Sequence, residues 1–113
     1  MKIVNKIDFL KLPSGTVYSK WDKDDKEVLQ LYIKGDSYSK NVDWNYMDLL
    51  DEIDEKDGYD RSWYKYNREE GDEFKQDFSF QRYRSYDTDL MFVVYDDEDV
   101  DKLIFHLVNR FKL

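Results

Sequence analysis

The sequence contains no cysteine, one proline, four glycines and one histidine among its 113 residues. The absence of cysteine excludes disulfides, thiolate metal sites and a cysteine nucleophile. The glycines stand at positions 15, 35, 58 and 71, too far apart for either common phosphate-binding loop. No apolar run approaches the roughly 20 residues that cross a bilayer, and residues 1–20 show no secretory signal. We therefore expect a cytoplasmic protein with no membrane partner.

Aromatic and charged residues dominate what is present. Phe, Trp and Tyr make up 18% of the chain, and ten of these rings are tyrosines. Charged residues make up 39%, with a formal net charge of −8 that favours solubility and repels nucleic acid. A chain of this length with a hydrophobic fraction of 41% can bury one core without disulfides or metals. The composition predicts a single acidic domain spanning residues 1–113.

Local patterns predict the secondary structure. Asn5 is placed to cap a first helix, and Pro13 to end it. Residues 47–53 fit a helix as well as a strand. Strands are expected at about 16–21, 28–33, 42–50, 78–82 and 90–95, and helices at 6–12, 61–70 and from 97 onward. The predicted fold class is α+β: a mainly antiparallel sheet of four to five strands with a C-terminal helix packed on one face.

The C-terminal helix has the clearest signature in the chain. Asp96 is its predicted cap, and the three acidic residues 97–99 fill its positive N-terminal turn. An apolar stripe follows at helical spacing, and we expect it to pack across the sheet. The stripe consists of Val100, Leu103, Ile104, Leu107, Val108 and Phe111.

Few residues suggest catalysis. His106 stands outside the apolar stripe of the last helix, with no serine or second histidine at a useful spacing. A calcium loop with Gly58 as its sixth residue would begin at Ile53 and end at Tyr64, and neither is a carboxylate. The acids at 96–99 are explained by helix capping. We therefore expect no enzymatic activity, no cofactor and no metal.

An acidic run is the first candidate for a binding surface. Seven carboxylates and one lysine lie between Asp48 and Asp60. Such a run is either a solvated loop or an acidic face offered to a basic protein, and both interpretations stay open. The candidate partner-binding residues are Trp44, Asp48, Asp51, Glu52, Asp54, Glu55 and Asp57.

A stretch that alternates cations with aromatic rings, residues 61–86, supports an alternative. Such a pattern can bind single-stranded nucleic acid, with bases stacked on the rings. The acidic residues at 69–73 oppose phosphate, and packing of arginine over aromatic faces explains the same residues. The candidate nucleic-acid-binding residues are Arg61, Trp63, Tyr64, Arg82 and Arg84.

Two stretches carry a resemblance. Residues 7–20 read IDFLKLPSGTVYSK, with IKGD at 33–36, and residues 89–104 read DLMFVVYDDEDVDKLI. In these stretches the chain resembles a family of small proteins met in phages, prophages and their mostly Gram-positive hosts. Members often have a glycine-containing segment before the last strand, whereas residues 84–88 contain none. The resemblance implies the context of a mobile-element accessory protein, in which small acidic inhibitors are common, and transfers no site residue.

These observations lead to three hypotheses. The first is a non-enzymatic protein-binding accessory protein of a phage or mobile element, an acidic inhibitor of a host defence or nucleic-acid enzyme, with a basic protein as partner. The second is a nucleic-acid or nucleotide-binding module that uses residues 61–86. The third is a structural accessory protein that works only as an oligomer, whose subunit number the sequence leaves open.

Overall fold

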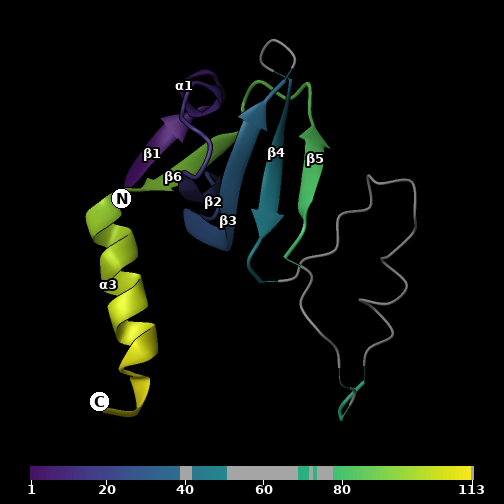
Figure 1. Cartoon of the computed structure of the whole chain (residues 1–113). Helices are drawn as coiled ribbons and strands as arrows, with labels where there is room; N and C mark the ends of the chain where they lie inside the picture. Colours follow the sequence, from purple (N-terminus) through teal and green to yellow (C-terminus); the bar gives the residue numbers. More distant parts are fainter. Residues whose placement is uncertain (39–41, 51–68, 72, 74–77, 113) are drawn as a thin grey trace.

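A computed structural model describes residues 1–38, 42–50, 69–71, 73 and 78–112. In these ranges six antiparallel strands form one sheet in the order β1-β6-β2-β3-β4-β5 (Figure 1). The last strand therefore lies between the first two. The elements are β1 (Lys2–Asn5), α1 (Lys6–Leu10), β2 (Val17–Asp22), β3 (Glu27–Ser37), β4 (Asp43–Asp48), β5 (Phe80–Arg84), β6 (Met91–Tyr95), α3 (Asp97–Val108) and a 3-10 turn, η2 (Arg110–Lys112).

The predicted mainly antiparallel sheet is confirmed, but the predicted number of four to five strands is wrong. The additional strand is β1, which has four residues and pairs with β6 so that Ile3 lies opposite Val93. A segment this short carries too few alternating positions to be recognised from its own sequence. Its conformation depends on hydrogen bonds to a strand that lies about 90 residues later in the chain.

Helix α1 begins where its cap predicts. The Asn5 side chain accepts a hydrogen bond from the backbone N–H of Asp8 at 2.8 Å, which satisfies one free donor of the first turn. The helix ends at Leu10, two residues before the predicted end. The Leu12 N–H still bonds to the carbonyl of Phe9 at 3.0 Å, in a turn that leads into Pro13.

Helix α1 places two buried side chains, Phe9 and Leu10, on one face of the sheet, the core face. The Phe9 ring stacks on Phe92 with centroids 3.9 Å apart. The indole N–H of Trp44 donates to the Tyr18 hydroxyl at 3.0 Å, so two polar ring atoms satisfy each other inside the core. Burial on this scale contributes roughly 1.5–3 kcal/mol per large side chain. The core consists of Phe9, Leu10, Tyr18, Tyr32, Trp44, Tyr46 and Phe92.

Two lysines are buried beside these rings. The Lys34 ammonium donates to the carbonyl oxygens of Leu12 and Gly35, both at 3.0 Å. Burial lowers its pKa from the ordinary lysine value. The Lys6 ammonium donates to the carbonyl of Asp87 at 3.1 Å and also to that of Ser85. Both lysines therefore hold loop backbone against the sheet.

Helix α3 has the predicted cap but not the predicted packing. Asp96 and Asp99 form a reciprocal capping box, with bonds of 2.8 and 3.1 Å. No residue of α3 is buried, and the helix extends away from the sheet (Figure 1). One residue, Asp96, in extended conformation connects α3 to β6. Helix α1 follows β1 just as directly and does pack on the sheet, so the length of the connection alone does not set the packing of α3.

Some expectations fall outside the described residues. The predicted helix 61–70 lies mostly in the undescribed range 51–68. Of the ambiguous segment 47–53, Met47 and Asp48 belong to strand β4, which confirms the strand there.

Candidate protein-interaction surface

The sheet has a second face, opposite the aromatic core. Residues that alternate with the core positions lie on this face, as the pairs Ile3 with Val93 and Trp21 with Met91 show. Exposure on this face is uneven: Ile3 is 44% exposed and Phe80 51% exposed, whereas Val93 is 3% exposed. Most positions on this second face are apolar: Ile3, Val17, Trp21, Val28, Leu31, Ile33, Met47, Phe80, Met91, Val93 and Tyr95.

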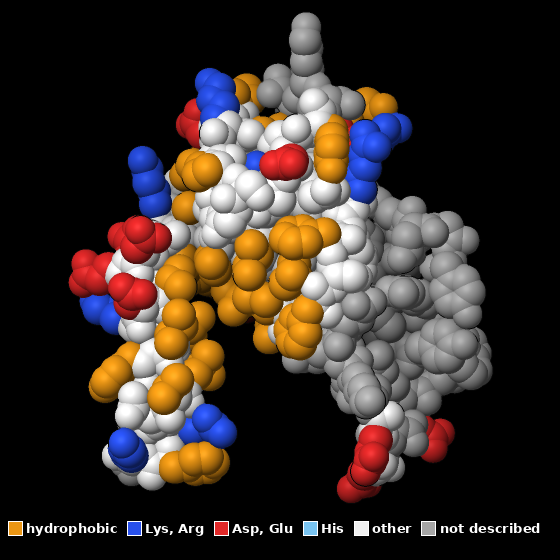
Figure 2. Space-filling model, in the orientation of Figure 1, with side chains coloured by type: hydrophobic (Ala, Val, Ile, Leu, Met, Phe, Trp, Pro, Cys, Tyr) orange, Lys and Arg blue, Asp and Glu red, His pale blue; other side chains and the backbone are white. Residues whose placement is uncertain are grey.

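Helix α3 presents a second apolar surface, the α3 stripe, which comprises Val100, Leu103, Ile104, Leu107, Val108 and Phe111. Exposure along it rises from 37% at Leu103 to 86% at Phe111. Hydrophobic side chains run along the helix and also over the part of the sheet turned to the viewer (Figure 2). Single exposed apolar residues are ordinary, but a contiguous apolar surface on a soluble domain marks an interaction site.

Charge changes sign along α3. Its first turn carries Asp97, Glu98 and Asp99, and the 3-10 turn η2 that follows it carries Arg110 and Lys112. The carboxylates lie at the positive end of the helix dipole and the cations lie beyond its negative end. Both groups of charges therefore stabilise the helix. An exposed pair, Lys102 with Glu98 at 3.1 Å, adds a small i,i+4 contribution.

The first turn of α3 also contacts the start of β1. The α-amino group of Met1 lies 2.7 Å from the Asp99 carboxylate. Its hydrogen bond to that carboxylate lowers the pKa of Asp99 and raises the pKa of the amino group. The backbone N–H of Asp96 also donates to Asp99 and lowers its pKa further. The exposed contact between Met1 and Asp99 joins the start of β1 to the first turn of α3.

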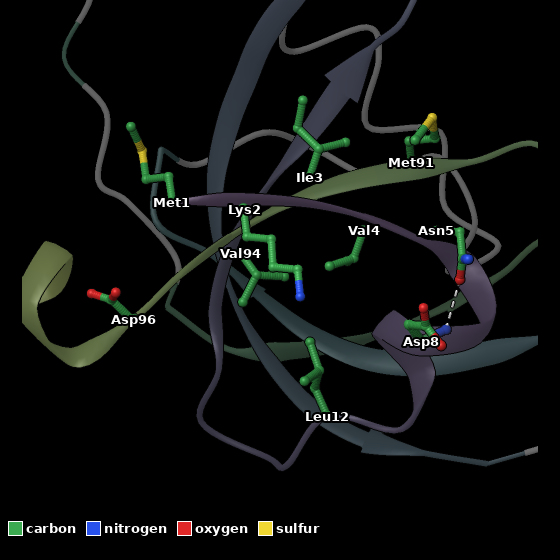
Figure 3. A pocket seen from close by; sticks show the side chains of 10 residues that line it. All are labelled: Met1, Lys2, Ile3, Val4, Asn5, Asp8, Leu12, Met91, Val94 and Asp96. Carbon is green, nitrogen blue, oxygen red and sulfur yellow. Dashed lines mark hydrogen bonds between the residues drawn. The ribbon is translucent and has the colours of Figure 1, made fainter.

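A shallow hollow of about 620 Å³ lies beside β1 (Figure 3). Its lining side chains point to both sides of the strand, so the hollow follows a sheet edge rather than entering the core. Its carboxylates are Asp8 and Asp96. The Asp8 N–H is bonded to the Asn5 cap, and Asp96 is the cap of α3. No nucleophile and base converge here, so the hollow has no catalytic arrangement.

The structure describes two of the seven candidate partner-binding residues. Trp44 is 1% exposed and Asp48 is 4% exposed, so both side chains lie in the interior rather than on a contact surface. Asp48 accepts a bond from the Leu50 N–H at 2.9 Å, which stabilises the turn after β4. The other five, Asp51, Glu52, Asp54, Glu55 and Asp57, lie outside the described residues.

Of the nucleic-acid candidates, Arg61, Trp63 and Tyr64 also lie outside the described residues. Arg82 and Arg84 are described, and both contact the fully buried carboxylate of Asp43. Arg82 bonds to it through two nitrogens, at 2.5 and 2.6 Å, and Arg84 lies at 3.6 Å. Both cations thus compensate a buried charge within the domain.

Sequence reasoning missed the exposed state of the α3 stripe. Helical spacing marks the apolar residues of α3 but does not indicate which surface covers them. His106 lies on α3 and is exposed, with its ring against Phe105. Within the described ranges, no three His, Asp or Glu side chains are grouped as a metal site would need.

Comparisons with known proteins do not indicate a function for this chain. No protein-family model, curated protein or solved structure matches the chain. Among the described helices, none has the length and apolar character to cross a membrane. Function must therefore be inferred from the geometry and chemistry of the surfaces.

Proposed function

We propose that this protein is a non-enzymatic protein-binding domain and that the α3 stripe is its contact surface. The observation that carries the proposal is a 12-residue amphipathic helix with no buried residue. An isolated helix of about this length is marginal in water, because nucleation costs more than a few hydrogen bonds return. Packing against a partner would supply the missing stabilisation. An apolar helix face laid into a groove is a common mode of protein recognition.

The charge distribution favours a protein partner with basic groups. Four acidic residues, 96–99, surround the start of α3. Such a cluster accelerates encounter with a basic surface, while the apolar stripe provides the contact area. The net charge of −8 and the pairing of Arg82 and Arg84 with Asp43 oppose the nucleic-acid alternative.

The biological setting of the proposal comes from the resemblance of residues 7–20 and 89–104. It is that of a cytoplasmic accessory protein of a phage or mobile element, which would act as an acidic inhibitor of a host defence or nucleic-acid enzyme. An acidic protein can occupy a site that normally receives phosphates. This setting predicts that the protein partner is basic.

Immobilised protein exposed to lysate of a Gram-positive host, with elution by rising salt, tests the proposal. Leu107→Asp places a charge in the α3 stripe, and His106→Asp adds the same charge one residue away on the polar face. We expect Leu107→Asp to abolish capture of a specific protein and His106→Asp to preserve it. Equal capture by both variants would show that the contact lies elsewhere, and capture of nucleic acid would support the alternative.

A further inference from the structure

We propose that the outer edge of strand β1 is a further binding site, which adds an extended, basic segment of a partner protein to the sheet as an antiparallel strand. Strand addition is a common mode of peptide recognition, in which main-chain hydrogen bonds give affinity and alternate side chains give specificity. Strand β1 ends the described sheet on one side, with β6 as its neighbour. This edge is separate from the α3 stripe and goes beyond the proposed function.

The register of the sheet determines which backbone groups of β1 face outward. In an antiparallel sheet, successive residues direct their N–H and C=O groups alternately to the two sides of the strand. The Lys34 N–H donates to the Thr16 carbonyl at 2.8 Å, so Thr16 and Tyr18 direct these groups to β3. Ser19 therefore directs its groups to β6, where it lies opposite Val93.

The same alternation continues through β6 to β1. Because Val93 faces β2, the next residue, Val94, faces β1 and pairs there with Lys2. The following residue of β1, Ile3, then directs its N–H and C=O away from the sheet. Within the described ranges, no residue bonds to these two groups. They can therefore pair with the N–H and C=O of one residue in an added strand.

The hollow beside β1 lies along this edge. Ile3 and Met91 point to one side of the strand, whereas Lys2, Val4 and Leu12 lie on the other side (Figure 3). Its volume of about 620 Å³ is typical of ligand-binding clefts. A residue paired with Ile3 would direct its side chain toward Ile3 and Met91, so we expect it to be apolar. Its two neighbours in the added strand would lie beside Lys2 and Val4.

Charge at the hollow favours a basic segment. The exposed carboxylate of Asp8 lies at the Asn5 end of β1 (Figure 3), and in the described part of the chain no cation forms an ion pair with it. Asp96 adds a second carboxylate, against the one positive side chain of Lys2. A lysine or arginine beside Val4 would therefore lie toward Asp8. The net charge of −8 disfavours a second copy of this chain as the occupant.

The experiment measures binding of a fluorescent peptide of about eight residues, in which valine and lysine alternate, by anisotropy with the full chain. A contact of this size should give a dissociation constant on the order of 100 µM. The same peptide with alternate backbone nitrogens methylated keeps its charge but loses donors, and it should bind at least tenfold more weakly. Equal binding of the two peptides would show attraction by charge alone and would overturn the proposal.

Ile3→Pro tests the edge of the protein directly. Proline removes the outward N–H but no hydrogen bond to β6, and an edge strand tolerates it where that N–H faces solvent. It should weaken binding at least tenfold, whereas Ile3→Val keeps the N–H and should bind within twofold of the wild type. Circular dichroism checks that each variant retains its sheet. In the wild type, peptide should also slow exchange of the Ile3 N–H, and unchanged exchange would overturn the proposal even if Ile3→Pro misfolds.

Further measurements test the choice of a basic occupant. Asp8→Asn should weaken binding of the lysine peptide about threefold and leave a matched valine–threonine peptide unaffected. Tighter binding of the valine–threonine peptide to the wild type would overturn the basic occupant, and so would a dimer of the free chain that Ile3→Pro dissociates. Leu107→Asp should leave peptide binding unchanged. Loss of capture by Leu107→Asp without any peptide binding would therefore overturn this site alone and support the α3 stripe.

Discussion

At the residue scale, the aromatic ring of Phe9 connects α1 to the sheet. It is fully buried, and its centroid lies 4.6 Å from Tyr18, 5.3 Å from Trp44 and 3.9 Å from Phe92. Two edge contacts and one stacked contact surround the same ring, so little space exists for the site to collapse if the ring is removed.

Phe9→Ala should lower the free energy of unfolding by about 3–5 kcal/mol, through lost burial and the cavity left behind. Urea denaturation followed by tryptophan fluorescence measures the change. Ile7→Ala is the matched control, because Ile7 belongs to the same helix and is 54% exposed. It should change stability by less than about 1 kcal/mol. Comparable losses from both variants would contradict the assignment of Phe9 as the centre of the core.

Tyr18 should make the free energy of unfolding fall at alkaline pH. Burial raises the pKa of its phenol above the ordinary value of 10.0, so folding favours the neutral form. The stability it contributes is fully present below pH 10.0 and is lost as the pH rises toward the folded pKa. Unfolding free energies between about pH 9 and 11.5 should therefore decline less steeply in Tyr18→Phe than in the wild type.

The same variant has a separate effect at neutral pH. Tyr18→Phe leaves the buried Trp44 N–H without its acceptor, which costs about 1–3 kcal/mol. If Tyr18→Phe keeps the full alkaline decline, other groups must cause it.

At the element scale, local signals predicted the elements well and their packing poorly. The caps at Asn5 and Asp96 and the strand expected at 42–50 depend on neighbouring residues. The structure confirms both caps and a strand, β4, at Asp43–Asp48. Strand β1 depends on pairing with β6, a distant strand, and the outward direction of α3 is not indicated by its own apolar spacing. Periodicity shows which residues of a helix are apolar, but not which surface covers them.

The same difference between local pattern and packing applies to the candidate interaction surface. The residues of the α3 stripe were identified from their spacing, whereas their exposure was not. The sequence places Trp44 among the candidate partner-binding residues because it is aromatic and stands beside an acidic run. Its position opposite Tyr83 on the core face is a property of the sheet register. A one-residue change of register would have exposed it.

Gly35 marks a close approach between strands β3 and β4. A Cβ at this position would lie 2.8 Å from the Cβ of Asn45 and 3.3 Å from the Phe80 ring. Gly35→Ala should therefore destabilise the domain by about 1–3 kcal/mol, measured by thermal or urea unfolding. Asn45→Gly removes the opposing Cβ, so the double variant should lose less than the sum of the two single losses. Strict additivity would show that this contact does not limit the position.

The capping box should affect the stability of α3 but not the stability of the sheet. Asp96→Ala removes the carboxylate that accepts from the Asp99 N–H, while the Asp96 N–H can still donate to the Asp99 carboxylate, and it should cost the helix about 0.5–2 kcal/mol. Because α3 has no buried residue, the loss should appear as faster amide exchange and weaker helical circular dichroism, with little change in unfolding of the sheet. Asp97→Ala keeps the cap and should have a smaller effect. Equal loss of sheet stability would mean that α3 supports the core.

At the scale of the whole molecule, net charge and the pairing of the described arginines act together against nucleic acid. We expect no binding of a fluorescent 20-nucleotide single strand at moderate salt, measured by anisotropy. Arg82→Ala/Arg84→Ala should leave this result unchanged but destabilise the fold, since Asp43 would lose its compensating cations. Micromolar binding by the wild type that the double variant lost would falsify the assignment of these arginines to Asp43.

The position of β6 between β1 and β2 has a consequence for the order in which the protein folds. Lys2 pairs with Val94 and Tyr18 with the same residue from the other side, so both contacts join the ends of a long loop of chain. Such non-local pairing slows folding, because the entropy of loop closure is lost before the strands gain contacts. During synthesis, the Phe9 ring lacks its stacked contact until Phe92 has left the ribosome. The nascent chain should therefore depend on chaperones until the sixth strand is available.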